Sequence, residues 1–256
     1  MSRAINKRAT VWVGFYGAIL LCWGLLFLTH GTVGASAPTV SFAYLDGLCI
    51  TAAETGFAGL FAMWCLMSLA MMLPTFVSAL RVFDELSDCG ASSASGLAAL
   101  IGGYLSIWIG FAALGAFVQS ELSARALVTH EGASLSYGLN AVLLIFAGAY
   151  QFSSVKDSCL SKCRQPLSFF MQYWSPGNRA ALRMGVRLGA YCLGCCWALM
   201  AIGFVGGMMN LVWMGAATLF MAFEKLPSIG RYLTAPAGIA CLLAGAAFAA
   251  RTLNVI

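Results

Sequence analysis

The sequence predicts an all-α protein, a polytopic bundle of transmembrane helices that forms one domain over residues 1–256. Hydrophobic residues make up 61% of the chain and charged residues only 9%, and the mean hydropathy is +0.87. A soluble domain, which needs a charged surface, carries about 25% charged residues. The apolar residues also form long runs of roughly the 20 residues that a membrane-crossing helix needs. Composition and pattern therefore exclude an ordinary soluble domain.

About seven apolar runs are long enough to be spans. They cover residues 11–28, 56–80, 96–118, 135–152, 184–205, 206–223 and 233–250. The run at 184–223 is twice the length of one span, and Gly206 and Gly207 in its middle supply the flexible backbone of a hairpin. Residues 153–183 are basic and aromatic, with Pro166 suited to the first turn of a helix. We expect this segment to lie in the cytoplasmic membrane interface.

The basic residues predict the orientation, because short cytoplasmic loops retain Lys and Arg. With the N-terminus in the cytoplasm, only Arg125 and Arg251 of the 14 basic residues fall outside. Glu224 and Lys225 end a span and are expected to be a solvent-side anchor. The net charge of +5 is thus explained by topology and requires no nucleic-acid partner. We predict an integral membrane protein in contact with the lipid bilayer, with its N-terminus in the cytoplasm.

The run at 184–205 contains three cysteines within five residues: Cys192, Cys195 and Cys196. Small residues recur with helical spacing through this run, which lets a neighbouring helix approach closely. This stripe consists of Gly185, Gly189, Cys192, Cys196, Leu199 and Gly203. The cysteines should therefore face protein. A lone free cysteine is usually a small hydrophobic packing residue, but a cluster of three favours a soft-metal site.

Methionines form a second pattern in the run at 56–80. Met63, Met67 and Met71 are spaced by four residues and share one helical face, and Met72 follows directly. Methionine often fills irregular apolar gaps, so packing is the alternative interpretation. Opposite a cysteine cluster, however, thioethers join thiolates as the soft ligands that select Cu(I).

Three further residues complete the candidate metal ligands. Cys159 and Cys163, four residues apart in the basic segment, could share a helical face and form a pair through which an ion enters or leaves. Met209 follows the predicted hairpin turn.

The motifs MWCLMSLAMMLP, CLSKCRQP, GVRLGAYCLGCCWALM and MMNLVWM, with the closing Glu224 and Lys225, resemble the bacterial family of predicted metal-binding integral membrane proteins. The resemblance covers residues 56–225. That family includes the membrane partner encoded beside a melanogenic tyrosinase, which is thought to deliver copper to that enzyme. The resemblance therefore implies copper handling in the bacterial cytoplasmic (inner) membrane, with a tyrosinase-like oxidase as a partner.

We predict that the protein is not an enzyme but holds Cu(I) and delivers it to a copper enzyme. Cys192, Cys195 and Cys196 would bind the ion, with help from Met67, Met71 or Met209. Zn²⁺ would need four ligands, and the sequence offers three thiols without an evident fourth.

Two alternatives stay open. A membrane redox enzyme subunit would place histidines at mid-membrane to bind haem, where neither His30 nor His130 falls. A structural or assembly subunit would use its cysteines for packing alone.

Overall fold

The computed structural model describes residues 2–34, 56–86, 94–129, 132–208 and 210–255. The regular structure of these residues is helical, apart from one isolated antiparallel bridge between Val128 and Ser134. The prediction of an all-α bundle is confirmed. Met209 and His130, and the side chain of His30, lie outside the described residues.

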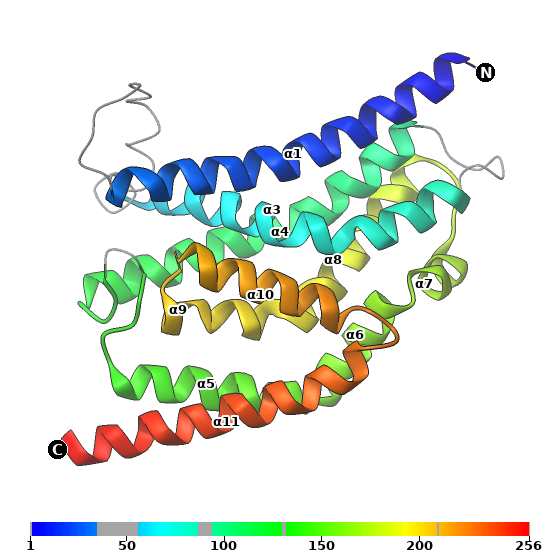
Figure 1. Cartoon of the computed structure of the whole chain (residues 1–256). Coiled ribbons are helices and arrows are strands. Elements are labelled where there is room, and N and C mark those ends of the chain that lie inside the picture. Colours follow the sequence, from blue (N-terminus) through cyan, green and yellow to red (C-terminus); the bar gives the residue numbers. More distant parts are fainter. Residues whose placement is uncertain (1, 35–55, 87–93, 130–131, 209, 256) are drawn as a thin grey trace.

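The helices run back and forth along one bundle axis, and the two termini lie at opposite ends (Figure 1). In chain order they are α1 (Ser2–Gly34), α3 (Phe57–Leu86), α4 (Ala94–Ala124), α5 (Tyr137–Gln151), α6 (Ser154–Arg164), α7 (Pro166–Tyr173), α8 (Asn178–Ala201), α9 (Gly203–Gly206), α10 (Leu211–Glu224) and α11 (Gly230–Val255).

Five of the described helical segments, those of α1, α3, α4, α8 with α9, and α11, are long and apolar enough to cross a membrane. α5 and α6 together would be a sixth, bent by 63° at their junction. α10 has 14 residues and is about 21 Å long, shorter than a hydrocarbon core of about 30 Å. The count of seven spans stays a prediction.

Small residues join α4 and α8 closely. A Cβ atom added to Gly185 would overlap the backbone of Leu100, and one added to Gly103 would overlap the backbone of Leu182. Only glycine lets the two backbones come this near, as small residues do at helix interfaces in membranes. The small-residue stripe predicted on the cysteine helix is therefore an interface. It brings Tyr104 of α4 against the cysteine-bearing face of α8.

The basic segment is packed more deeply than we expected. Ser153 caps α6 by accepting a hydrogen bond from the backbone N–H of Lys156 at 3.1 Å, and Pro166 begins α7 as predicted. Phe169 and Phe170 are completely buried. Burying aromatic rings is strongly favourable, and these two pack into the bundle core. The interfacial position of the segment as a whole stays a prediction.

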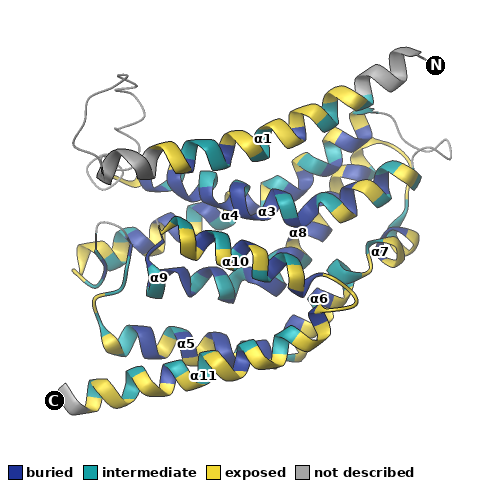
Figure 2. Ribbon diagram, viewed as in Figure 1, coloured by how far each residue is buried: buried dark blue, intermediate teal, exposed yellow. Residues whose placement is uncertain are grey.

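Much of the outer surface is apolar. Figure 2 shows exposed residues along α1 and α11, among them Val13, Leu20 and Leu243, which are 72%, 74% and 68% exposed. Soluble monomers rarely expose contiguous apolar surface over whole helices. The pattern is typical of helices that face lipid.

Candidate metal centre

Three thiols converge in the C-terminal half of α8. Cys192, Cys195 and Cys196 are 2%, 1% and 1% exposed, and their sulfur atoms all lie within 4.8 Å of one another. The Sγ atoms of Cys195 and Cys196 are 3.3 Å apart, and Cys195 Sγ lies 3.1 Å from the carbonyl oxygen of Cys192, to which it donates. Every cysteine that the structure describes is a free thiol. The trio is thus buried, reduced and preassembled.

A fourth thiol lies near this trio, on α6. Cys163 borders the same cavity as Cys192, although it is not one of the three cysteines whose sulfur atoms all lie within 4.8 Å of one another. Cys159, one helical turn earlier, has a different neighbour, because its sulfur lies against Gly194 of α8. The structure therefore places the two cysteines of the expected pair in different surroundings. The expectation that no fourth cysteine lies near the trio is wrong.

Lys225 is the main feature that the sequence reasoning missed. Its ammonium group donates hydrogen bonds to Cys192 Sγ at 3.0 Å and to Thr75 Oγ1 at 2.7 Å, and the residue is only 9% exposed. The hydroxyl of Tyr104 lies 3.0 Å from the same sulfur. The sulfur of Cys192 is consequently in contact with both the ammonium group of Lys225 and the phenol hydroxyl of Tyr104.

The prediction that Glu224 and Lys225 anchor the end of the span in solvent is therefore wrong for both residues. Glu224 is 1% exposed and forms an ion pair with Lys156 of α6 at 2.8 Å. Arg164, near the end of α6, donates from Nε to the carbonyl oxygen of Glu224 at 2.9 Å. Charged groups inside a bundle need such partners, because an unpaired buried charge is very costly. These contacts fix the end of α10 against α6, which carries Cys163.

A small cavity adjoins the thiols. It has a volume of about 10 Å³ and is bordered by Tyr104, Cys163, Leu188, Cys192 and Lys225, among others. That volume suits about one water molecule or one small ion. The site therefore combines soft ligands, one countercharge and room for a single ion.

The predicted methionine stripe faces the bundle. Met67 and Met71 of α3 are each 3% exposed and line a second cavity of about 10 Å³ together with residues of α8 and α10. Met63 is buried as well but does not border this cavity. Met72 contributes its carbonyl oxygen, which accepts a hydrogen bond from Tyr104 at 3.3 Å.

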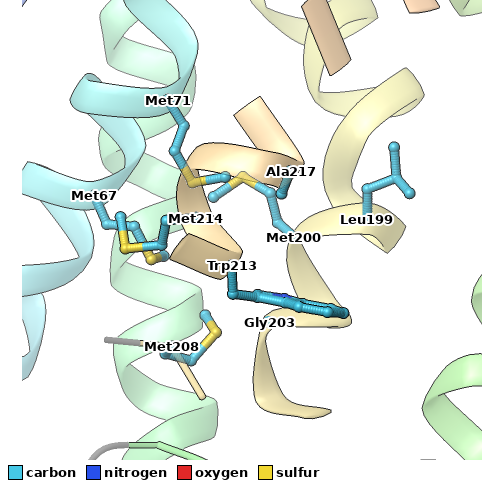
Figure 3. A pocket seen from close by; sticks show the side chains of 9 residues that line it. All are labelled: Met67, Met71, Leu199, Met200, Gly203, Met208, Trp213, Met214 and Ala217. Atoms are coloured by element: carbon cyan, nitrogen blue, oxygen red, sulfur yellow. The ribbon is translucent and has the colours of Figure 1, made fainter. Parts of the chain in front are cut away.

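Three more methionines border this second cavity and were not predicted as ligands: Met200, Met208 and Met214. Figure 3 shows their side chains with those of Met67 and Met71. Met200 follows Cys196 by one helical turn, a signal that the sequence did contain.

Met214 lies on α10 and reaches the second cavity because the chain turns back before this helix. Gly207 has a positive φ of 90° at this turn, as the predicted hairpin requires. Asn210 then caps α10, its side chain accepting from the backbone N–H of Trp213 at 3.1 Å.

Comparison with known proteins agrees with a copper-handling role. Residues 61–248 match the model of the family described as PpoB2, copper chaperone. No curated protein and no solved structure matches the chain. The match covers most of the chain, including the thiol-bearing helices α6 and α8, and it confirms the relationship that the cysteine and methionine motifs suggested. A copper chaperone family is not an enzyme family. The chain therefore belongs to the PpoB2 family of copper chaperones.

Proposed function

We propose that this protein is an integral membrane chaperone that holds Cu(I) at a buried thiol centre and passes it to a copper enzyme. The observation that carries the proposal is the convergence of Cys192, Cys195 and Cys196 beside the ammonium group of Lys225, with Cys163 on the same cavity. Thiolates are soft ligands that select Cu(I). A tyrosinase-like oxidase is the client that the family resemblance suggests.

Charge favours Cu(I) over Zn²⁺ at this centre. Four thiols would satisfy the number of ligands that Zn²⁺ takes, so the ligand count no longer argues against zinc. Zn²⁺ with four thiolates has a net charge of about −2, and Lys225 reduces this to about −1. Cu(I) bound by two thiolates has a net charge of about −1, which Lys225 cancels. A neutral site costs least in a low-dielectric interior.

Delivery requires that the bound ion can leave. Since Cu(I) is stable with only a few soft ligands, an incoming ligand from a partner can replace one thiolate at a time. The other thiols of the cluster stay close enough to hold the ion during such an exchange.

The membrane location rests on the apolar helices and their exposed surfaces. Arg8 near the start of α1 pairs with Asp84 near the end of α3 at 3.3 Å, and Ser95 of α4 bonds Asn178 at the start of α8. These helix ends mark one end of the bundle, which we assign to the cytoplasm because it collects most of the basic residues. Lys156 and Lys225 no longer support this assignment, because both are buried at internal sites.

The first prediction concerns the ligands. Replacing Cys192, Cys195 and Cys196 together by Ala should abolish tight copper binding, because it removes the three thiols whose sulfur atoms lie within 4.8 Å of one another. Metal analysis after loading with Cu(I) under reducing conditions, in the presence of a competing Cu(I) chelator, measures this. Cys22→Ala is the matched control, since Cys22 is buried in α1 and should leave binding unchanged.

Two results would contradict this prediction. One is retention of all tightly bound copper by the triple variant, and the other is stoichiometric zinc in the purified wild type with no Cu(I) binding. Copper on the wild type should also activate a copper-free tyrosinase-type oxidase faster than the chelator complex does.

The second prediction concerns Lys225. Lys225→Leu removes the countercharge and a charge-assisted hydrogen bond, which contributes about 1.5–3 kcal/mol. Since about 1.4 kcal/mol corresponds to a tenfold change, we expect the Cu(I) affinity to fall by about 10- to 100-fold. Lys162→Leu on the exposed side of α6 is the control. An unchanged affinity in Lys225→Leu, with helicity preserved, would rule out the charge-balancing role.

The third prediction concerns topology. Because the termini lie at opposite ends of the bundle (Figure 1), a reporter active only outside the cytoplasm should work when fused to the C-terminus and fail when fused to the N-terminus. Activity at both termini, or at the N-terminus alone, would refute the orientation.

A further inference from the structure

Five methionines surround one cavity next to the thiol centre. Met67 and Met71 come from α3, Met200 from α8, Met214 from α10 and Met208 from the turn before α10. We call this group the methionine cage. Each of its members is at most 3% exposed, and Figure 3 shows side chains from different elements converging on the same space. The cage thus depends on the tertiary fold and not on one helical stripe.

The methionine cage is distinct from the thiol centre but adjacent to it. Met200 lies four residues beyond Cys196 on α8, which is about 6 Å farther along the helix axis. The thiol centre has its own cavity, bordered by Cys163, Cys192 and Lys225. Two separate cavities on one helix therefore carry two different sets of sulfur ligands.

Packing alone explains buried methionines but not this arrangement. Methionine is flexible and normally fills gaps, yet here five methionines line a cavity of about 10 Å³ that their side chains leave unfilled. An apolar cavity of this kind is a poor site for water, which needs polar partners. A soft monovalent ion suits it better, because neutral thioethers bind such an ion without adding charge.

Trp213 adds an aromatic ring that can attract a cation in this cavity. Its ring borders the same cavity and is held against Gly206, where an added Cβ would meet the ring at 2.5 Å. An aromatic face attracts a cation, most strongly when water is absent.

We infer that the methionine cage is a second binding site for a soft monovalent metal ion, Cu(I) or its analogue Ag(I). The cage binds through neutral thioethers, so it holds the ion more weakly than the thiol centre and releases no protons on binding. Its place near the Gly206–Gly207 turn puts it toward the end of the bundle opposite the N-terminus. The ion would pass between the thiol centre and that end; this transfer role rests on the proposed thiol site, whereas binding to the cage does not.

The test counts Cu(I) ions on the full-length protein and locates them with selenium. Wild type should bind about two ions per chain, one at each site, and the Met67→Leu/Met214→Leu variant about one. Leu keeps the size and apolarity of Met, so the fold should survive. The control is Met184→Leu/Met221→Leu, two buried methionines outside the cage, which should still bind about two.

Selenomethionine labelling gives the second readout. X-ray absorption at the selenium edge should show a copper neighbour in wild type and in the Cys192/Cys195/Cys196→Ala variant, but not in Met67→Leu/Met214→Leu. Two results would refute metal binding by the methionine cage. One is the absence of a copper neighbour at selenium in the wild type, and the other is an undiminished ion count in the Met67→Leu/Met214→Leu variant. If the cysteine variant binds no copper and shows no copper neighbour at the selenium edge, the methionine cage is also refuted as a binding site. Undiminished tight binding in the cysteine variant would instead refute the thiol centre.

Discussion

The arrangement of this protein depends on a buried positive charge that must find partners inside an apolar bundle. Lys225 meets this requirement with Cys192 and Thr75, which come from two different helices. A single ammonium group therefore fixes α10 against α3 and α8. The buried pair of Glu224 and Lys156 does the same for α6 one residue earlier. Because unpaired charges in such an interior are very costly, these contacts specify which helix faces which.

The same helices bring the sulfur ligands together. Gly103 and Gly185 let α4 and α8 approach until their backbones touch, so that Tyr104 reaches the sulfur of Cys192. The ion pair between Lys156 of α6 and Glu224 of α10 holds the helix that carries Cys163, which borders the same cavity as Tyr104 and Cys192. A buried, preassembled cluster of thiols suits a chaperone, because its ligands need little reorganisation to take the ion.

The sequence was sufficient for the helical fold, the Cys192 trio and the inward face of Met67 and Met71, because helical spacing determines which residues of one segment share a face. It could not reveal Cys163, Lys225 or Met214 as members of a site, because spacing within one helix does not determine which helices meet. Lys225 was misassigned for a physical reason. A lysine at the end of a span normally extends to water, and only the position of Thr75 and Cys192 turns it inward.

The most direct test of the thiol centre is X-ray absorption at the copper edge of the Cu(I)-loaded protein. The account predicts a first coordination shell of sulfur alone, with fewer sulfur neighbours or displaced copper after Cys192, Cys195 and Cys196 are replaced by Ala. A shell that contains nitrogen or oxygen, or a spectrum that the replacement leaves unchanged, would contradict it.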